Sequence, residues 1–264
     1  MTELPRGIDT SAPHPARIYD YWLGGKDNFE ADRRAAEAGY RAFPGVLQSV
    51  RANRDFLARV VRHLVTEAGI RQFLDVGSGL PTANNTHEIA QQKAPESRIV
   101  YVDNDPVAVL HARVMLQSAP EGRTDFYQAD ARDPAFILEQ AAATLDFRKP
   151  VALIMLGLLH FLHDDDQVAA IMAAFRAAVA PGSHLAISHL ASDIEPEIMA
   201  EFLRGMAEEG VPPRALRSRE QVAGLFEGLE LLAPGVVPVS RWRPDTDAEA
   251  SAVTTLWGGV ARKR

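Results

Sequence analysis

QFLDVGSGLPTANNTHEIA, residues 72–90, is the stretch that decides the fold. An apolar run ends in Asp75, and Gly77 and Gly79 then lead into a segment with helical features. Glycine lets a ligand approach the backbone closely, and a helix N-terminus offers free N–H groups. A strand, a glycine turn and a helix in this order predict a ligand site on the turn.

Short β-rich runs alternate with amphipathic segments from residue 72 onward, which is typical of a parallel sheet with crossover helices. We expect an α/β fold with a doubly wound, mostly parallel sheet of seven strands. No helix separates the last two strands, which predicts an antiparallel pair at one edge. The strands are expected at 72–76, 98–103, 124–128, 151–156, 184–189, 230–232 and 252–260, and the helices at 82–93, 106–117, 134–142, 164–180, 196–209 and 218–225.

The composition excludes several classes of protein. With 264 residues, 47% hydrophobic and 24% charged, the chain suits one large α/β domain with an appendage. A formal net charge of -7 argues against nucleic-acid and membrane-surface partners, which usually require a basic field, and favours a small molecule or a protein. Cysteine is absent, which excludes a disulfide framework, a thiol nucleophile and a zinc–thiolate site.

Neither a secretion signal nor a membrane span is predicted. Residues 1–22 lack the basic and apolar regions of a signal peptide. The longest apolar run, residues 151–159, is about half of the roughly 20 residues that a span requires. We therefore expect a cytoplasmic protein in which this run is a buried strand.

The region ahead of the sheet has a tail and a helix. Residues 1–13 are expected to be mobile. Apolar side chains at helical spacing in residues 43–68 predict a helix that packs on the core. Four arginines of this helix are expected to form only a solvated face: Arg51, Arg54, Arg59 and Arg62.

Acids also end the second and third predicted strands. Asp103, in VYVDNDP, stands where an acid in such folds accepts both ribose hydroxyls of a nucleoside. Asp130, in YQADARD, would then lie near the base. Thr82 replaces the third glycine of the dinucleotide fingerprint, and no Gly-Lys-Ser/Thr follows the turn, so neither that fingerprint nor a P-loop is complete. These acids predict a nucleoside ligand at the sheet edge where the strand order reverses.

Together, FLDVGSG, VYVDNDP and YQADARD resemble the motifs of the Rossmann-like S-adenosylmethionine-dependent methyltransferases. Over nearly the whole chain, ARIYDYWLGGKDNFEADR with FLDVGSGLPTANNTHEIAQ is similar to the bacterial family of these enzymes long catalogued as a domain of unknown function. The resemblance implies a Rossmann-like methyltransferase fold, a transferase activity, and S-adenosylmethionine as the cofactor, released as S-adenosylhomocysteine.

The resemblance also implies a set of cofactor contacts. Asp75 would order the turn, partly through water near the methionine amino group. Asn104 would flank the adenine, and Asp130 and Ala131 would meet its edge. Asp130 and Asp105 have an alternative role as caps of the following turn or helix. The remaining implied contacts are Gly77, Ser78, Gly79, Asp103 and Leu156.

The segment ARIYDYWLGGKDNF, residues 16–29, crowds aromatic residues around the pair Gly24–Gly25. A glycine pair is a flexible break, and nearby Tyr or Asn side chains are able to hydrogen-bond the methionine carboxylate or close over the site. We interpret residues 1–69 as a tail and helical lid, which related folds also use, ahead of a cofactor-binding core at 70–264. Plain packing of the aromatic rings is the alternative. The candidate cofactor contacts in the lid are Arg17, as partner of the carboxylate, Asp20, Tyr21 and Asn28.

The stretch LGLLHFLHDDDQ, residues 156–167, follows the fourth strand at the edge where the methyl group would point. Methyl transfer from a sulfonium requires alignment and, for a weakly acidic hydroxyl, a base. The stretch resembles the LHD region of small-molecule O-methyltransferases, in which a histidine after this strand deprotonates the acceptor, and His160 matches that histidine by position. Phe161, however, stands where an acid is common. A structural role for His160 is the alternative. A metal site of His160, His163 and residues 164–166 is disfavoured, because those acids suit the first turn of a helix.

The sequence therefore predicts methylation of a small-molecule acceptor, most simply at oxygen. The Asn/Asp-Pro-Pro-Phe/Tyr run of amide and amino methylation is missing, which argues against a nucleic-acid base as acceptor. A regulator that binds the cofactor without an acceptor is the alternative; a filled cavity beside His160 would favour it, and a roomy one the enzyme. Thr82 and the absence of a Tyr-x-x-x-Lys pair disfavour an NAD-dependent oxidoreductase.

Overall fold

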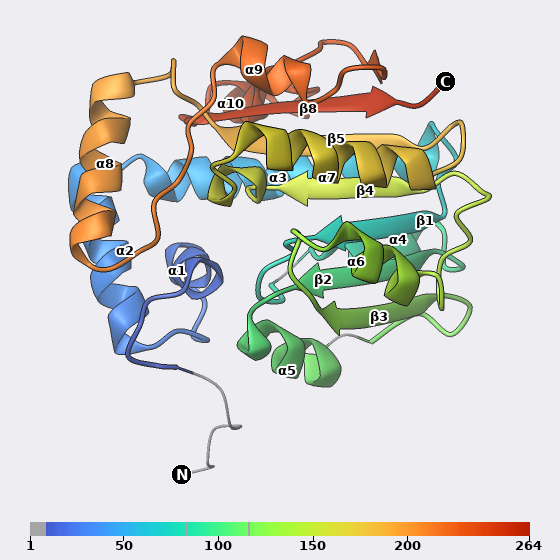
Figure 1. Ribbon diagram of the computed structural model, residues 1–264, viewed down its shortest axis with the longest axis horizontal. Helices are drawn as coiled ribbons and strands as arrows, with labels where there is room; N and C mark the ends of the chain where they lie inside the picture. Colours follow the sequence, from blue (N-terminus) through green and yellow to red (C-terminus); the bar gives the residue numbers. More distant parts are fainter. Residues whose placement is uncertain (1–8, 83, 116) are drawn as a thin grey trace.

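The computed structural model describes residues 9–82, 84–115 and 117–264, which form an eight-stranded sheet (Figure 1). The strand order is β3-β2-β1-β4-β5-β8-β6, and the short β7 pairs with β8. Strands β1 to β5 are parallel, and β8 is antiparallel to both β5 and β6. The bounds are β1 Gln72–Val76, β2 Arg98–Asp103, β3 Arg123–Gln128, β4 Ala152–Leu156, β5 His184–Leu190, β6 Glu230–Leu231, β7 Val237–Pro238 and β8 Leu256–Arg262.

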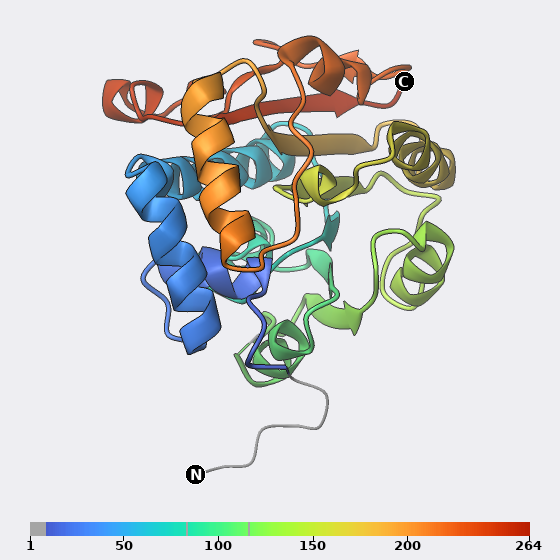
Figure 2. The same cartoon turned by 60° about the vertical axis from the view of Figure 1, so that its left-hand side comes forward.

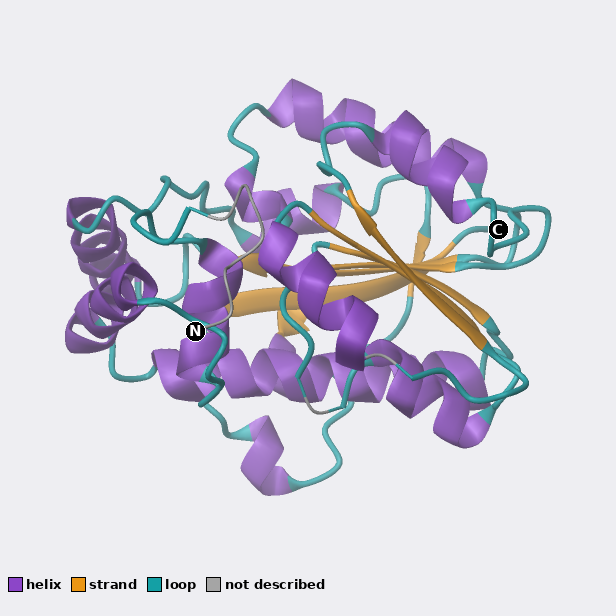
Figure 3. Cartoon of the chain, turned by 90° about the horizontal axis from the view of Figure 1, so that it is seen from below, coloured by secondary structure: helices purple, strands orange, loops and turns teal. Residues whose placement is uncertain are grey.

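Helices cover both faces of the sheet (Figure 3). Helices α3 and α4 pack on one face, and α6, α7 and α9 on the other. A further layer of α1, α2 and α8 stands at the carboxyl ends of the parallel strands (Figures 1 and 2). None of the helices in the described ranges is long and apolar enough to cross a membrane. The bounds are α1 Pro15–Trp22, α2 Glu30–Ala42, α3 Val46–Thr66, α4 Thr86–Lys93, α5 Pro106–Met115, α6 Pro134–Ala141, α7 Asp165–Ala178, α8 Pro196–Glu208, α9 Arg219–Gly224, α10 Asp247–Ala250, and the 3-10 turns η1 Leu159–Phe161 and η2 Val239–Arg241.

Side chains of the central strands alternate between two buried clusters. On β1, Phe73 packs with α3, while Leu74 and Val76 pack with α6 and α7. On β2, Ile99 and Val100 divide in the same way. Because both faces are covered, these strands carry apolar side chains on both faces and not only at alternate positions. Strands β1 and β2 begin and end at the predicted residues.

The doubly wound, mostly parallel sheet with an antiparallel edge is confirmed, and the differences are local. The two-residue strand β7 adds an eighth strand to the expected seven. The helix expected from residue 82 begins at Thr86, because Asn85 caps it in a capping box. The last strand, expected from residue 252, begins at Leu256, and the Thr255 N–H before it donates to Ser49 of α3 at 3.2 Å.

Arg59 is buried, so the expectation of a wholly solvated arginine face on α3 was wrong. Its guanidinium donates to the carbonyl oxygens of Trp242 at 2.9 Å and Val239 at 2.7 Å, and it pairs with Glu249 at 2.7 Å. Arg51 remains exposed, as expected. Helical periodicity alone does not show that a segment far along the chain covers this face.

The N-terminal helices share a buried cluster with the sheet. Ile18 and Trp22 of α1 lie in the same cluster as Phe73 of β1. The first eight residues of the expected mobile tail lie outside the described residues, and the next residue, Asp9, accepts a hydrogen bond from Arg17 at 3.1 Å. The division between a lid region and a core at residue 69 stays a prediction.

Candidate active site

A cavity of about 580 Å³ opens at the carboxyl ends of β1, β2 and β4, against α1, α3 and α8. The strand order reverses between β1 and β4 at this edge, which is where doubly wound sheets bind ligands. Small-molecule sites usually measure about 300 to 1,000 Å³. The lining has two parts: acids and glycines after the first strands, and aromatic and apolar side chains from the helices.

The turn after β1 requires its glycines. Gly77 and Gly79 have φ angles of 74° and 69°, in the region that only glycine adopts readily. A Cβ on Gly77 would lie 2.7 Å from a methyl carbon of Leu158. The Gly77 N–H donates to the carbonyl of Val102 at 2.7 Å, so the turn is held against β2.

Asp75 is a buried carboxylate at the cavity wall. One oxygen accepts the hydroxyl of Thr86 at 2.7 Å. Burial raises the pKa of Asp75 to about 6; Arg54 opposes this rise, and Asp103 adds to it. A positive charge placed in the cavity would favour the ionised form of Asp75.

Asp103 orders the turn from the end of β2. Its carboxylate accepts the N–H of Gly79 at 2.8 Å and the N–H of Asp105 at 2.9 Å. Burial raises the pKa of Asp103 as well. A carboxylate has about four lone-pair positions, so about two remain for ligand hydroxyls.

Asp130, Ala131 and Asn104 form the outer end of the cavity lining. Asp130 accepts the backbone N–H of Arg132 at 2.9 Å and pairs with its guanidinium at 3.0 Å. Asp130 thus makes the turn contact that the sequence left open as its alternative role, and it also lies on the cavity wall.

His160 enters the cavity wall from η1, three residues after Gly157, which follows the end of β4. The residue is 6% exposed, and its Nδ1 is buried without a hydrogen-bond partner in the described part of the chain. Burial, together with His189, Arg214 and Arg217, holds the pKa of His160 well below its usual 6.5. The imidazole is therefore neutral at neutral pH.

A second histidine is fixed beside His160. Arg217 donates to Nε2 of His189 at 2.6 Å, which leaves Nδ1–H of His189 to donate to the Leu190 carbonyl at 2.9 Å. The two imidazole centroids are 5.7 Å apart, with the rings perpendicular. Arg217 also pairs with Asp165 at 2.6 Å, so that carboxylate neutralises the arginine rather than orienting His160.

The acids after His163 begin a helix. Asp164 caps α7 by accepting the N–H groups of Asp166 and Gln167 at 2.9 and 3.2 Å. His163 lines the cavity and contacts the Pro213 carbonyl at 3.1 Å. Within the described ranges, no three metal-ligating side chains converge.

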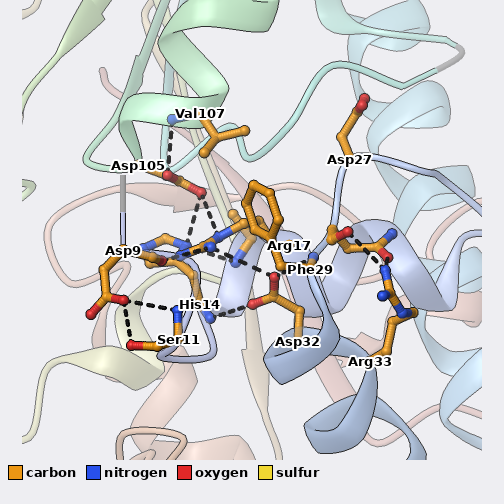
Figure 4. Close-up of polar contacts among 12 residues, drawn as sticks. Asp9, Ser11, His14, Arg17, Asp27, Phe29, Asp32, Arg33, Asp105 and Val107 are labelled. Carbon is orange, nitrogen blue, oxygen red and sulfur yellow. Dashed lines mark hydrogen bonds and ion pairs between the residues drawn. The ribbon is translucent and has the colours of Figure 1, made fainter. Parts of the chain in front are cut away.

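The structure places Arg17 in a buried polar network rather than on the cavity wall (Figure 4). Its guanidinium lies 3.5 Å from Asp105 and 3.6 Å from Asp32. His14, which does line the cavity, contacts the same Asp105 at 3.2 Å. Asp105 also caps α5 by accepting the N–H of Val107 at 3.0 Å, so this network joins the N-terminal helices to the segment that follows Asp103.

The other lid candidates also bind protein groups away from the lining that the described residues form. Asp20 accepts hydrogen bonds from the Asn28 side chain at 2.9 Å and the Asp27 N–H at 3.0 Å, which closes the glycine loop. The Tyr21 hydroxyl donates to Glu37 at 2.6 Å. The phase of α1 explains this: Tyr21 points toward α2, while Tyr19 points to the cavity.

Sequence reasoning missed several lining residues. Ala16, Tyr19 and Trp22 share the cavity face of α1, and their three-residue spacing was the available signal. The Tyr19 hydroxyl donates to the Val50 carbonyl at 3.0 Å and accepts from Asn53 at 3.1 Å. The Asn53 side-chain oxygen is buried and lacks a partner among the described groups. Arg54 lines the cavity too.

A model of the S-adenosyl methyltransferase family matches residues 1–264. The chain belongs to this family. It is an S-adenosylmethionine-dependent methyltransferase with a Rossmann-like fold, as the motifs indicated.

Solved structures resemble this methyltransferase over its whole length. A DUF574 family protein from Streptomyces avermitilis is 45% identical, with a TM-score of 0.92 over 97% of this chain and 99% of that chain. A protein from Thermobifida fusca is 40% identical, with a TM-score of 0.90 over 100% of both chains. An O-methyltransferase family protein from Burkholderia thailandensis shares the fold at 14% identity, with a TM-score of 0.55 over 96% of this chain and 64% of that chain. No curated protein matches the sequence.

Proposed function

We propose that this methyltransferase methylates an oxygen of a small-molecule acceptor held beside His160. The proposal rests on one observation: a single cavity joins the glycine turn and Asp103 to a compartment bordered by His160. A roomy cavity at this histidine favours an enzyme over a protein that binds the cofactor alone.

The first part of the cavity fits S-adenosylmethionine in charge and polarity. Asp103 would hold the ribose hydroxyls with its unused lone pairs, and Asn104, Asp130 and Ala131 would surround the adenine. The Ser78 hydroxyl is buried and has no partner within the described residues, so it is available to the cofactor. Bound there, S-adenosylmethionine supplies a methyl group on a positively charged sulfur.

Charge also supports this placement of the cofactor. Asp75 has a raised pKa because its carboxylate is buried. The cationic amino group or sulfonium of S-adenosylmethionine near it would restore the ionised form. Gly77, Gly79 and Leu156 would bring backbone and an apolar wall beside the methionine part, with Leu156 nearest the end of β4.

The second part of the cavity suits an aromatic or otherwise apolar acceptor. Trp22, Phe43, Phe161 and Phe202 contribute rings to the lining. Such rings bury large apolar surfaces and pair with other rings in offset or edge-on geometry. The polar side chains of the lining include Asn53, His160 and Arg214.

His160 is suited to accept a proton from the acceptor. Its neutral imidazole has a lone pair available at neutral pH, because burial lowers its pKa. The same lowering makes it a weak base, which favours an aromatic hydroxyl, with a pKa of about 10 as in tyrosine, over an aliphatic one. The hydroxyl proton would pass to His160 as the acceptor oxygen bonds to the methyl carbon, while the bond from that carbon to sulfur would break and leave S-adenosylhomocysteine.

Substitution of His160 tests the proposal. His160→Ala and His160→Gln should each reduce turnover by roughly 10²- to 10⁴-fold, measured as S-adenosylhomocysteine released with a panel of phenolic acceptors, while cofactor affinity changes little. His163→Gln is the matched control, because His163 also lines the cavity but contacts the Pro213 carbonyl.

The pH profile gives a second test. Because the pKa of His160 lies well below 6.5, protonation should not reduce activity until the pH falls well below 6.5. Normal turnover by His160→Gln would show that alignment alone drives the reaction and that His160 is structural.

A further inference from the structure

Arg214 belongs to the segment between α8 and α9, which runs across the carboxyl edge of the sheet (Figure 2). The residue lines the cavity. Its guanidinium carbon lies 5.5 Å from the ring centroid of Phe161, the neighbour of His160, and 5.8 Å from that of Phe202 on α8. The positive charge therefore lies among the aromatic rings of the acceptor compartment.

The guanidinium of Arg214 has no hydrogen bond or ion pair with any described residue, and its Nε is sealed from solvent. Arg214 is half-buried, and the three arginines that are fully buried are all paired: Arg17 with Asp32, Arg59 with Glu249 and Arg217 with Asp165. Burial lowers the pKa of Arg214 to about 10.

Contacts with the rings compensate only part of this burial. A cation over an aromatic face gains electrostatic energy, but the ring accepts no conventional hydrogen bond from the five N–H donors of a guanidinium. Buried charges in proteins are nearly always paired with an opposite charge. The missing partner is therefore expected to be an anion that enters the cavity.

We propose that Arg214 binds a carboxylate of the methyl acceptor, so that the acceptor is an aromatic hydroxy acid. This inference rests on the proposed function. A planar guanidinium donates two parallel hydrogen bonds to a carboxylate and fixes its orientation. With the acid held at Arg214 and the ring among Phe161 and Phe202, the hydroxyl is directed toward the His160 side of the cavity.

The position of Arg214 favours the acceptor over the carboxylate of the cofactor. Arg214 lies with Phe161 and Phe202, and its charge acts on His160. At the glycine turn, the cation that acts on Asp75 is Arg54 and not Arg214.

The test measures ligand binding to the full-length protein saturated with S-adenosylhomocysteine, so it requires no methyl transfer. Matched pairs of probes are compared by calorimetry and thermal shift: 4-hydroxybenzoate with 4-hydroxybenzamide, phenylacetate with phenylacetamide, and 4-hydroxycinnamate with its amide. Phenyl phosphate is added as a second kind of anion. The wild type should bind at least one acid more tightly than its amide. Arg214→Gln should lose at least about tenfold in affinity for that acid and leave amide binding unchanged.

Four results of these binding measurements would overturn the inference. The first two are equal binding of every acid and its amide by the wild type, and an acid preference that persists in Arg214→Gln. The third is a preference of the wild type for phenyl phosphate over all the carboxylates. The fourth is a tenfold loss of S-adenosylhomocysteine affinity in Arg214→Gln, which would assign the guanidinium to the cofactor.

Stability without ligand separates a binding role from a structural one. Arg214→Met keeps the bulk of the side chain and removes an unpaired charge, so its melting temperature should equal or exceed that of the wild type. A clear decrease would show that the ring contacts are structural and would refute the assignment. If an acid binds through Arg214 but His160→Gln methylates its hydroxyl normally, the inference stands and the proposed role of His160 fails.

Discussion

Asp75→Asn should stabilise the ligand-free protein while weakening its affinity for S-adenosylmethionine. Asp75 is 6% exposed, and its pKa is raised by burial from 3.8 to about 6. The folded protein therefore holds the proton more tightly than the unfolded chain does. Asparagine mimics the protonated form, and its carbonyl oxygen still accepts the Thr86 hydroxyl.

The sign and size of the effect follow from the two pKa values. Below about pH 3 the carboxyl is largely protonated in both states, and the substitution changes stability little. As the pH rises, the unfolded chain ionises first, so the wild type loses stability until the pH passes about 6. The variant should therefore be more stable by about 3 kcal/mol at pH 7.5, by about 1.5 kcal/mol at pH 5 and by about 0.5 kcal/mol at pH 4.

Urea unfolding of the ligand-free protein at these three pH values measures the difference. Glu121→Gln is the control, because it changes the net charge by the same amount as Asp75→Asn but removes an exposed carboxylate. Calorimetry with S-adenosylmethionine should show weaker binding by the variant, which lacks the negative charge. A variant less stable than the wild type at pH 7.5, or an advantage that does not shrink toward pH 4, would refute the reasoning.

Three further predictions concern the turn and the lid. Asp103→Ala should weaken S-adenosylhomocysteine binding by about 1.5 to 3 kcal/mol, because hydrogen bonds to a charged acceptor are lost, and equal affinity in calorimetry would contradict the ribose assignment. Cofactor binding should slow hydrogen exchange in residues 9–29. Asp105→Asn should speed exchange there in the ligand-free protein, because the Asp105 carboxylate contacts His14 and Arg17; exchange that responds to neither change indicates passive packing. Gly25→Ala should disorder the glycine loop, because a Cβ would overlap the Asp20 carboxylate, and an unchanged melting temperature would argue against this.

The sheet was predictable because its strands are covered on both faces. The apolar runs that end in Asp75 and Asp103 fit only buried strands, and β1 and β2 have the predicted bounds. Prediction was weaker where a local pattern competes with a distant partner. Thr255 has a β-branched side chain typical of strands, yet its N–H donates to Ser49 in α3.

The candidate site was predictable where it follows the strand ends and not where it depends on the phase of a helix. Asp103 and His160 line the cavity because the carboxyl ends of parallel strands meet there. On α1, composition drew attention to Tyr21, but the helix turns Tyr19 toward the cavity instead. Arg214 had no sequence signal, because only the packed structure shows that it has no partner.

The position of β8 has a consequence for the order of folding. This late strand is hydrogen-bonded to β5 on one side and β6 on the other, and Arg59 reaches a carbonyl 183 residues away. Contacts between distant segments require the closure of long loops, which slows folding. During synthesis on the ribosome, β5 therefore presents an open edge until β8 emerges, and open edges promote aggregation. The yield of folded protein should thus depend more on the rate of synthesis and on chaperones than on equilibrium stability.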